Sequence, residues 1–530
     1  MASQFHLADL FETVAAAVPD RLAIRSDTGD VTYAGLDERT DRLAAALADR
    51  GIWRGDRIGL YLMNGPEYLE AFLAACKLGA VPFNVNYRYG AEELEYLFGN
   101  AGAAVIFHND DFTIIMQDLR ARLPHIRFSV VVGDGDAGAS ERYEALMETP
   151  ARKGFTRSED DFLLQYTGGT TGMPKGVMWP HKAFFFACLG GGGHFHPAGQ
   201  ISAPDEIAGR ATEGYQLSMF TIAPLMHGAA IWAAWSGLLG GLTLVLDPMR
   251  SFDAEAIWDR VSKFSVNVVQ IVGDAMAQPL HQAMQDNPGR WQVQQVVNFG
   301  SGGAVFSQHL KDAISALLPN ARITDGMGTS EGGISGMAEP SADGVMRLPA
   351  HDDQWVIVED RLAQPGETGL LGRAGHIPVG YYNDPAKTAE VFRTVAGKLW
   401  TLSGDAARLE ADGTITMFGR GSTCINTGGE KVFPEEVEAA LRAHPSIRDT
   451  VVLGRPDQKW GEAVVALVSL MKGASLPEQA ELREFLDGKL AGYKCPKAVL
   501  AVDEVRRSPA GKQDYSWARQ VLEEWVEEAA

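Results

Sequence analysis

A glycine- and threonine-rich segment carries the clearest chemistry in this amino-acid sequence. Residues 167–176 read TGGTTGMPKG and follow Phe162-Leu163-Leu164-Gln165, which has the composition of a buried strand. Glycines let the backbone turn its N–H groups toward an anion, threonine hydroxyls add donors, and Lys175 adds a positive charge. Because no Gly-Lys-Ser/Thr closes the segment, it is not a Walker A loop. It predicts a polyphosphate site formed by Thr167, Gly168, Gly169, Thr170, Thr171, Gly172 and Lys175.

The overall composition excludes several classes of protein. The chain has 530 residues, and its 47 Lys+Arg against 68 Asp+Glu give a formal net charge of −21. This negative excess argues against nucleic acid or an anionic membrane as the main partner, although a local nest can still hold a small anion. The hydrophobic fraction of 46% and the charged fraction of 22% are those of a folded globular protein, which excludes disorder as the main state.

Cysteine use and the N-terminal residues indicate a reducing compartment. The four cysteines are widely separated and form no C-x-x-C pair, so neither a zinc ribbon nor a disulfide framework is predicted. The N-terminus MASQFHLAD lacks the bases and apolar core of a secretory signal. Residues 228–246 carry no charge, but Gly240-Gly241 divides them, and we interpret them as a buried helix followed by a core strand. We therefore expect a cytoplasmic protein with no transmembrane segment.

The elements that must hold the phosphate loop alternate between helix and strand patterns. Helical spacing covers residues 67–78 and 308–318, and short apolar runs suggest strands at 105–107, 130–132, 266–272 and 296–299. Short apolar strands separated by helices imply parallel βαβ units whose sheets are covered on both faces. The predicted fold is α/β, with a large N-terminal region, residues 1–419, of βαβ-type sheets and covering helices.

The C-terminal part of the chain has a different pattern. Pro434-Glu435-Glu436 begins a helix, strands are expected at 450–453 and 463–470, and a second helix at 481–490. Gly-Arg-Gly-Ser at 419–422 interrupts the preceding pattern. We therefore expect a small mobile α+β domain over residues 420–530, with a hinge near 420–422.

Seven further motifs make the whole chain resemble a known family. Leu164 through Lys175 matches the AMP-binding signature of the adenylate-forming superfamily, which includes acyl-CoA synthetases, peptide-synthetase adenylation domains and luciferases. Any one motif would be weak evidence, but their number and order make the resemblance specific. The further motifs are TIAPLMHG at 221–228, GSGGA at 300–304, GTSE at 328–331, WTLSGD at 400–405, GR at 419–420, GGEK at 428–431 and SPAGK at 508–512.

The resemblance implies an ATP-dependent acyl-CoA ligase that works in two half-reactions. A small-molecule carboxylic acid and ATP would give acyl-AMP and pyrophosphate, and coenzyme A would then give acyl-CoA and AMP. Because two anions must meet, cations and donors have to offset their repulsion. Lys512 is assigned this role, since a lysine stays protonated and can bridge carboxylate and phosphate. Glu331 would offer a hard oxygen to Mg²⁺, and His227 would lie between the acyl site and the metal.

The same resemblance assigns the remaining site residues. Asp405 would accept from the ribose hydroxyls and Arg420 would donate to them, while Ser330 lies near the α-phosphate. After rotation of the small domain, Gly428, Gly429 and Lys431 would line the passage for the pantetheine arm, and Trp460 lies where family members often contact coenzyme A. The other residues assigned to the nucleotide are Gly302, Gly303, Ala304, Asp325, Gly326, Met327, Gly328 and Thr329.

Three positions depart from the family pattern. Met327 stands where an adenine-stacking aromatic is usual, so a softer contact through sulfur is expected. Ser422 replaces the usual acidic or lysine hinge residue, and Ala510 replaces a common Ser/Thr before Gly511-Lys512. Because none of these changes removes a catalytic charge, an active enzyme is still expected.

The acyl group and the acceptor leave alternatives open. The run Cys424–Lys431 most resembles bacterial fatty-acyl and sterol-side-chain CoA ligases, with an aryl-acid CoA ligase of the benzoate or cinnamate type as the alternative. Phe184-Phe185-Phe186 and Gly190–Gly193 are expected to form a wall of the acyl pocket. Because the chain ends 18 residues after Lys512, we expect no fused carrier domain, although loading of a separate carrier protein stays open. A nucleotide-binding regulatory protein without catalysis is a further alternative, and a homodimer is one expected assembly.

Overall fold

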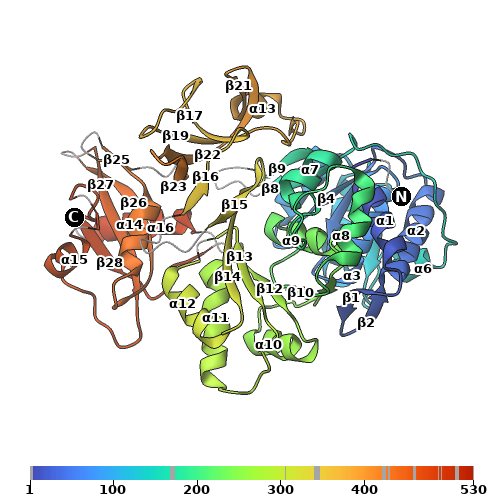
Figure 1. Ribbon diagram of the computed structural model, residues 1–530, viewed down its shortest axis with the longest axis horizontal. Helices are drawn as coiled ribbons and strands as arrows, with labels where there is room; N and C mark the ends of the chain where they lie inside the picture. The colour runs from blue at the N-terminus through green and yellow to red at the C-terminus, as the bar shows by residue number, and fades with distance from the viewer. Residues whose placement is uncertain are drawn as a thin grey trace.

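The computed structural model describes most of the chain. The described residues are 4–167, 173–304, 306–338, 346–420, 425–427, 430–457, 461–487, 489–490, 492–507 and 513–528. Their strands form four sheets, which we call sheets I to IV (Figure 1).

Sheets I and II form the body of the N-terminal region. Their neighbouring strands are mostly parallel, and antiparallel pairs occur at the ends β14–β15, β1–β2, β8–β9 and β9–β20. In spatial order, sheet I contains β15 (Gly333–Ala338), β14 (Arg322–Thr329), β13 (Asn298–Gly302), β12 (Val268–Ile271), β10 (Ser218–Thr221), β11 (Thr243–Val245), β1 (Leu22–Ser26) and β2 (Gly29–Thr32). Sheet II contains β20 (Gly380–Tyr381), β9 (Lys175–Pro180), β8 (Phe162–Thr167), β4 (Val81–Asn84), β3 (Arg57–Tyr61), β5 (Ala103–Asn109), β6 (Phe128–Val132) and β7 (Glu141–Arg142).

Helices cover both sheets, as the short apolar strands require. The most extensive apolar cluster joins strands of both sheets to α1 (Leu7–Ala17), α2 (Tyr33–Asp49), α3 (Pro66–Lys77), α7 (His181–Cys188) and α9 (Gly228–Leu239). A second cluster packs sheet I against α10 (Ala254–Lys263), α11 (Gly273–Asp286) and α12 (Gln308–Leu317). A third packs sheet II against α4 (Ala91–Ala101) and α5 (Thr113–Arg122), while α6 (Tyr143–Met147) and α8 (Ile207–Glu213) complete the helices of this region. The expected α/β architecture is confirmed.

Sheet III lies between the body and the C-terminal lobe. It is largely antiparallel, and it carries the β22–β23 hairpin after which the chain enters the lobe (Figure 1). Its strands are β16 (Arg347–Pro349), β23 (Thr414–Arg420), β22 (Lys398–Leu409), β19 (Thr368–Arg373), β17 (Gln354–Val358), β18 (Arg361–Leu362) and β21 (Phe392–Val395), and α13 (Pro385–Val391) precedes β21.

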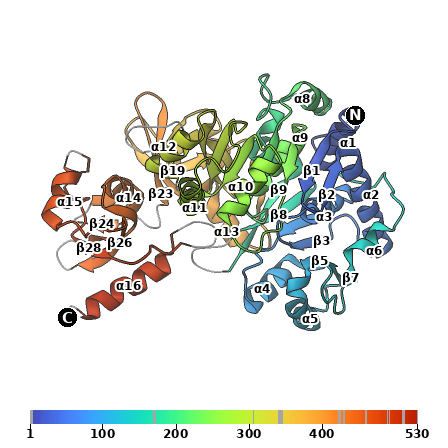
Figure 2. The same ribbon diagram turned by 90° about the horizontal axis from the view of Figure 1, so that it is seen from below.

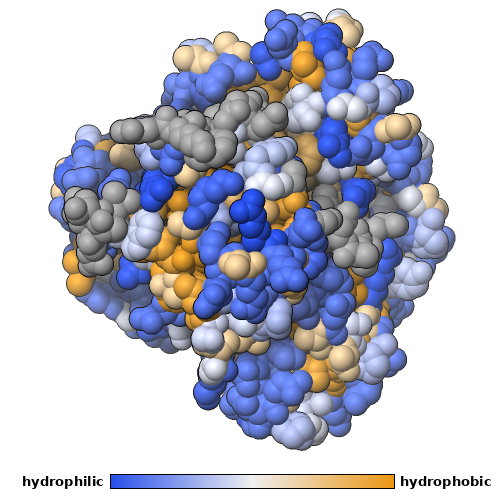
Figure 3. Space-filling view, turned by 90° about the vertical axis from the view of Figure 1, so that its left-hand side faces the viewer, coloured by the Kyte–Doolittle hydropathy of each residue, from blue (hydrophilic) through white to orange (hydrophobic). Residues whose placement is uncertain are grey.

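The C-terminal lobe is a small α+β unit around sheet IV. Figure 2 shows α16 running along one side of the lobe. Figure 3, which looks onto the left-hand side of Figure 1, where the lobe lies, shows a mostly hydrophilic surface with apolar patches. The strands are β25 (Glu430–Val432), β24 (Ile425–Thr427), β27 (Gly461–Leu470), β26 (Ile447–Asp457) and β28 (Ala498–Ala501), and the helices are α14 (Pro434–Arg442), α15 (Gln479–Leu486) and α16 (Tyr515–Glu528). The boundary at 419/420 and the mobility of this lobe stay predictions.

Two local expectations can be compared with the observed bounds. The uncharged stretch 228–246 forms α9 and then β11, as interpreted, and among the described residues no helix has the length and apolarity needed to cross a membrane. The helix expected at 481–490 instead ends at Leu486, because Asp487 adopts extended backbone angles. Asp-Gly pairs such as the one that begins at Asp487 favour a chain reversal.

Candidate functional site

One large cavity collects most of the residues that the motifs single out. Its volume is about 2860 Å³, and sheets I, II and III and the C-terminal lobe all contribute to its lining. The predicted site residues that line it are Thr167, Lys175, His227, Gly302, Gly303, Ala304, Asp325, Gly326, Met327, Gly328, Thr329, Ser330, Glu331 and Asp405.

Other predicted residues lie outside the described part of the chain. For Arg420 in β23 and Lys431 in β25, the backbone is described but the side chain is not. The predicted residues outside the described ranges are Gly168, Gly169, Thr170, Thr171, Gly172, Gly428, Gly429, Trp460 and Lys512, together with the departures Ser422 and Ala510. Their assigned roles stay predictions.

Close approach of two neighbouring strands forms the floor of the cavity. Gly302 in β13 and Gly326 in β14 are partners in parallel register. A Cβ on Gly302 would lie 3.2 Å from the carbonyl oxygen of Gly326, and one on Gly328 would lie 2.7 Å from the carbonyl oxygen of Gly333. The glycines of both motifs therefore let neighbouring backbone segments approach closely at the cavity, where a side chain would clash.

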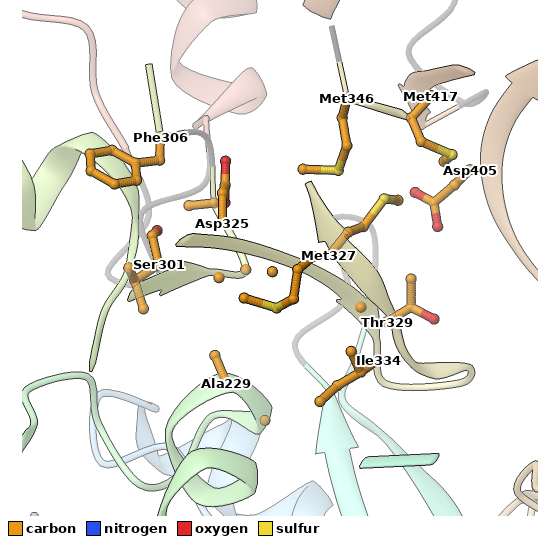
Figure 4. Close-up of a pocket in the computed structure, with 18 of the residues that line it drawn as sticks. Ala229, Ser301, Phe306, Asp325, Met327, Thr329, Ile334, Met346, Asp405 and Met417 are labelled. Carbon is orange, nitrogen blue, oxygen red and sulfur yellow. The ribbon is translucent and has the colours of Figure 1, made fainter. Parts of the chain in front are cut away.

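Asp325 marks one end of this floor. Figure 4 shows it on the same side of the cavity as Ser301 and Phe306. Its carboxylate pairs with the Lys311 ammonium at 2.8 Å, and the same ammonium lies 5.6 Å from the ring centroid of Phe306. Burial raises the pKa of Asp325, and the positive charge of Lys311 opposes this shift only in part. This end therefore offers a flat apolar ring beside a hydrogen-bonding carboxyl group.

Methionine side chains surround the middle of the cavity. Met327 lies between the Asp325 side and the opposite wall, where Figure 4 shows Met346 and Met417 next to Asp405. Met327 and Met346 both pack against the apolar cluster of sheet III that includes Met417. Thioethers therefore form much of this part of the cavity surface, and the softer contact expected between Met327 and adenine stays a prediction.

Asp405 lies at the far end, on the β22–β23 hairpin. It is 7% exposed, and its Oδ2 accepts a hydrogen bond of 2.6 Å from the Ser403 hydroxyl. Arg420 is its cross-strand partner in antiparallel register. The hairpin thus brings together two residues that are separated in sequence and that the motifs assign to a single ribose.

Two groups suited to phosphate and metal also line the cavity. Lys175, the first residue of β9, forms an ion pair with Asp384, which caps α13 by accepting from the backbone N–H of Lys387 at 2.9 Å. Glu331 accepts a hydrogen bond of 2.7 Å from the Tyr381 hydroxyl. Neither Tyr381 nor Asp384 belongs to the motifs that predict the site. Asp384-Pro385 is a recognisable helix start, but nothing in the sequence indicates which lysine it meets.

One face of α9 lines the remaining branch of the cavity. Ala229, Trp232, Ala233 and Ser236 recur at helical spacing along this face, which begins just after His227. The Trp232 indole N–H donates to Oε1 of Gln165 across 3.2 Å, so this branch passes beside the end of β8. Further lining residues of this branch are His194, Phe195, Tyr215, Leu217, Met219 and Val268.

The expected acyl wall at Phe184–Phe186 is wrong. Phe184 and Phe185 are buried in the main apolar cluster, where Phe184 contacts Trp179 and Phe185 contacts Phe5. Among the described residues, this part of the chain lines the cavity through His194 and Phe195 instead. The apolar run folds as helix α7. Its phenylalanine side chains pack in the main apolar cluster, so they do not contact a ligand in the cavity.

A buried charge network organises the C-terminal lobe beside the cavity. Glu438 is fully buried, accepts from the Val452 N–H at 2.8 Å and pairs with Arg442 at 3.1 Å. Asp449 pairs with Arg442 at 3.2 Å and with Arg507 at 2.8 Å. Burial alone would raise the pKa of Asp449, but the two guanidinium groups outweigh it and hold that pKa below its usual value.

Family models and known proteins match nearly the whole chain. Residues 11–382 match the model described as AMP-binding enzyme, and residues 436–512 match the AMP-binding enzyme C-terminal domain. The chain is 40% identical, over 99% of its length and 98% of the relative's, to a medium/long-chain-fatty-acid–CoA/3-oxocholest-4-en-26-oate–CoA ligase of Mycobacterium marinum. It is also 40% identical, over 97% of its length and 95% of the relative's, to the 3-oxocholest-4-en-26-oate–CoA ligase of Rhodococcus rhodochrous.

Solved structures with low sequence identity share the fold. The anthranilate CoA ligase AuaEII in complex with anthranoyl-AMP superposes with a TM-score of 0.84 at 20% identity, covering 99% of each chain. ATP-bound MatB from Rhodopseudomonas palustris superposes with a TM-score of 0.78 at 23% identity, covering 97% of this chain and 98% of that one. At these identities the likeness concerns the fold alone.

Proposed function

The chain belongs to the AMP-binding enzyme family, and we propose that it is an ATP-dependent acyl-CoA ligase for fatty acids or for the carboxylated side chain of a sterol. The resemblance inferred from the motifs is thereby confirmed. As an acid–thiol ligase it joins a carboxylate to the α-phosphate of ATP with release of pyrophosphate. The thiol of coenzyme A then displaces AMP to form the thioester.

The observation that carries the proposal is the continuity of the cavity. Asp405, Lys175, Glu331 and the α9 branch all belong to the same cavity. A nucleotide would lie with its ribose at Asp405, its base against Met327 and Asp325, and its phosphates toward Lys175. The carboxylate of the acid would then meet the α-phosphate near Ser330 and His227, where the α9 branch begins.

Charge compensation explains how these residues favour adenylation. The attacking carboxylate and the phosphate are both anionic, so donors and cations at the meeting point lower the barrier. Lys175 would hold the departing pyrophosphate, and Lys512, through its motif, would bridge the carboxylate and the α-phosphate. These roles remain proposals that rest on the motif match and on the described part of the cavity.

Glu331 fits a magnesium ion by the chemistry of its surroundings. Mg²⁺ prefers one or two carboxylates together with phosphate oxygens and water, and Glu331 lines the cavity near Lys175. The Tyr381 hydroxyl binds Oε1 of Glu331 and orients the carboxylate. A bound Mg²⁺ would offset the charge of the β- and γ-phosphates.

The dimensions of the α9 branch favour an elongated acid. At a helical rise of about 1.5 Å per residue, the nine steps from His227 to Ser236 span about 13 Å. Leu217, Met219 and Val268 make much of this length apolar, while His194, Tyr215 and Ser236 add polar groups. An apolar channel with isolated polar groups suits a long acyl chain or a sterol skeleton that carries an oxygen function.

For the second half-reaction, the C-terminal lobe supplies part of the same cavity. Glu435, Glu436 and Ala439 of α14 line it. We propose that the lobe rotates about a hinge near 420–422, so that Gly428, Gly429, Lys431 and Trp460 face coenzyme A. The proposal extends to action in the cytoplasm as a homodimer. Cell fractionation and sedimentation equilibrium test these two points.

A panel of carboxylic acids tests the proposed reaction. Purified protein with ATP and Mg²⁺ should release pyrophosphate with long-chain fatty acids and with sterol-side-chain acids, and acyl-CoA should accumulate when coenzyme A is added. Faster turnover of benzoate or cinnamate would favour the aryl-acid alternative. Pyrophosphate release without thioester formation would favour loading of a carrier protein. ATP binding without any acid-dependent pyrophosphate release would contradict the enzymatic assignment.

A further inference from the structure

The turn between β20 and α13 lies beside the start of β9 and carries an acidic residue. β20 pairs with β9 in antiparallel register, Tyr381 opposite Val177, and the Tyr382 N–H donates to the carbonyl of Gly176 at 2.8 Å. Asn383 then takes a left-handed backbone conformation with φ of 56°, which asparagine tolerates better than most residues. This reversal brings Asp384 beside Lys175 at the start of β9.

The two carboxylate oxygens of Asp384 have separate partners. Oδ1 accepts from the Lys387 N–H at 2.9 Å and caps α13, whereas Oδ2 accepts from the Lys175 ammonium. The Lys175 side chain is 40% exposed and the Asp384 side chain 28%, so the ion pair lies where solvent and ligands reach it. The cap is a structural contact, but the pair with Lys175 involves a residue that lines the cavity.

We propose that Asp384 is a positioning residue that holds Lys175 as its counter-ion until the phosphates of ATP replace it, and that takes Lys175 back when pyrophosphate leaves. The inference rests on the proposed function, in which Lys175 faces the polyphosphate. Anionic phosphate and anionic carboxylate compete for one ammonium, so each lowers the affinity of Lys175 for the other. Asp384 therefore weakens binding of both ATP and pyrophosphate.

The energetics allow a reversible exchange. An exposed ion pair is a weak interaction, so phosphate can displace the carboxylate without a large penalty. The Lys175 hydrogen bond holds the pKa of Asp384 below its usual value, so the carboxylate stays charged and competes at neutral pH. Because tightly held pyrophosphate would reverse adenylation, a built-in competitor favours product release.

The same turn also contacts the carboxylate that faces the metal. Tyr381, three residues before Asp384, donates its hydroxyl to Glu331 at 2.7 Å. The backbone N–H of Asp384 donates in turn to the carbonyl of Tyr381 at 3.3 Å. One short segment therefore holds partners for Lys175, which is assigned to the phosphates, and for Glu331, which is assigned to magnesium. The exchange would thus take place where pyrophosphate leaves.

Asp384→Asn separates the two contacts of this residue. Asparagine caps helices about as well as aspartate, so α13 should be retained, whereas the negative charge next to Lys175 is lost. Measured by calorimetry, the Kd values for ATP and for pyrophosphate should both fall about 2- to 5-fold, the range of one exposed ion pair. In steady state, KM for ATP should fall and inhibition by pyrophosphate should strengthen, while Asp384→Glu should restore both.

Two comparisons make the test specific. Asp253 caps α10 by accepting from the Ala256 N–H at 3.0 Å, and it is not among the residues that line the cavity, so Asp253→Asn should leave both Kd values unchanged. In a Lys175→Met background, Asp384→Asn should no longer tighten binding, because the two residues act as a pair. If Asp384→Asn does not fold, Asp384→Ser tests the same loss of charge with another capping residue.

The outcomes separate this inference from the proposed function. Failure of the wild-type protein to bind ATP would contradict the proposed function itself. Normal ATP binding with an unchanged or larger Kd in Asp384→Asn would overturn the role of Asp384 alone. Tighter binding that persists in the Lys175→Met background would also overturn the role of Asp384. The effect would then come from the loss of a negative charge near the cavity rather than from the loss of the ion pair with Lys175.

Discussion

The Tyr381 hydroxyl donates a hydrogen bond to Oε1 of Glu331 across 2.7 Å, joining the end of β20 to the turn between β14 and β15. The two residues are far apart in sequence, and Tyr381 is only 6% exposed. Tyr381 belongs to sheet II, and Glu331 lies in a turn between two strands of sheet I. The hydrogen bond between them therefore orients the carboxylate that is assigned to magnesium. The pair is thus one of the contacts through which the two sheets share one site.

Removing this hydroxyl should weaken the use of magnesium. In Tyr381→Phe the Glu331 carboxylate loses an ordered donor, and hydrogen bonds to charged groups contribute about 1.5–3 kcal/mol. We expect the Mg²⁺ concentration for half-maximal pyrophosphate release to rise about tenfold or more, as that energy implies. Tyr382→Phe, at the next position and outside the described cavity lining, should behave as wild type. An unchanged magnesium requirement in Tyr381→Phe would separate Glu331 from the metal.

Loss of Lys512 should affect the two half-reactions unequally. Its motif assigns it to charge compensation during adenylation, and removal of one such group typically lowers the rate about 10²- to 10³-fold. Lys512→Ala should therefore abolish most acid-dependent pyrophosphate release, while thioester formation from supplied acyl-AMP changes much less. Lys472→Ala, at an exposed lysine of the same lobe, is the control. Equal losses in both half-reactions would argue against rotation of the lobe between them.

Truncating Met327 should weaken nucleotide binding. Contacts between sulfur and an aromatic ring contribute about 0.3–1.5 kcal/mol, so Met327→Ala should raise Kd for ATP about 2- to 10-fold. Met327→Tyr, which restores the aromatic type usual in the family, should bind ATP at least as tightly as wild type. Met471, a methionine that is 47% exposed, provides the control substitution to alanine. Normal ATP affinity in Met327→Ala would place the base elsewhere in the cavity.

Filling the α9 branch should change acid selectivity rather than adenylation as such. Ala233 lies on the lining face of α9, and Ala233→Phe would occupy space assigned to the distal acyl group. Turnover of long-chain and sterol acids should fall by tenfold or more, while that of short acids changes little. Because overpacking can destabilise a helix, the melting temperature is measured in parallel. A uniform loss with all acids would show that the branch does not hold the acyl chain.

The charge network of the C-terminal lobe should make stability depend on pH. The folded-state pKa of Asp449 is lowered, so its contribution to stability is complete above the unfolded-state value near 4 and disappears as pH falls through the folded-state value. Asp449→Asn leaves Arg442 and Arg507 without this partner and should cost about 3 kcal/mol at neutral pH.

Denaturant unfolding of both proteins between pH 7 and pH 3 tests this dependence. The difference in unfolding free energy between wild type and Asp449→Asn should shrink as the solution becomes more acidic. Asp503→Asn, at an exposed aspartate of the same lobe, should show no such trend. A difference that stays constant down to pH 3 would contradict the assignment to an ionised Asp449.

Much of the fold could be predicted because its signals are local. The apolar runs at 105–107, 130–132 and 296–299 lie within or overlap β5, β6 and β13, and Pro434 begins α14 as its position before two carboxylates indicates. The helix expected at 481–490 ends earlier, at Leu486, because Asp487 adopts extended backbone angles even though the apolar spacing continues beyond it. Element type follows from periodicity over many residues, whereas an element's end depends on a single backbone angle.

The sequence by itself determined the family and the reaction class, because each motif carries its chemistry in consecutive residues, and most of the site residues that it predicts line one cavity. Only the tertiary structure decided which partners those residues have. Asp384 reaches Lys175 from just after the neighbouring strand of sheet II, and Tyr381 reaches Glu331 between sheets II and I. The phenylalanine run at 184–186 packs in the core rather than around a substrate. Such contacts join positions with no fixed spacing along the chain. They depend on how strands β9, β14 and β20 are ordered in space, and no local pattern encodes that order.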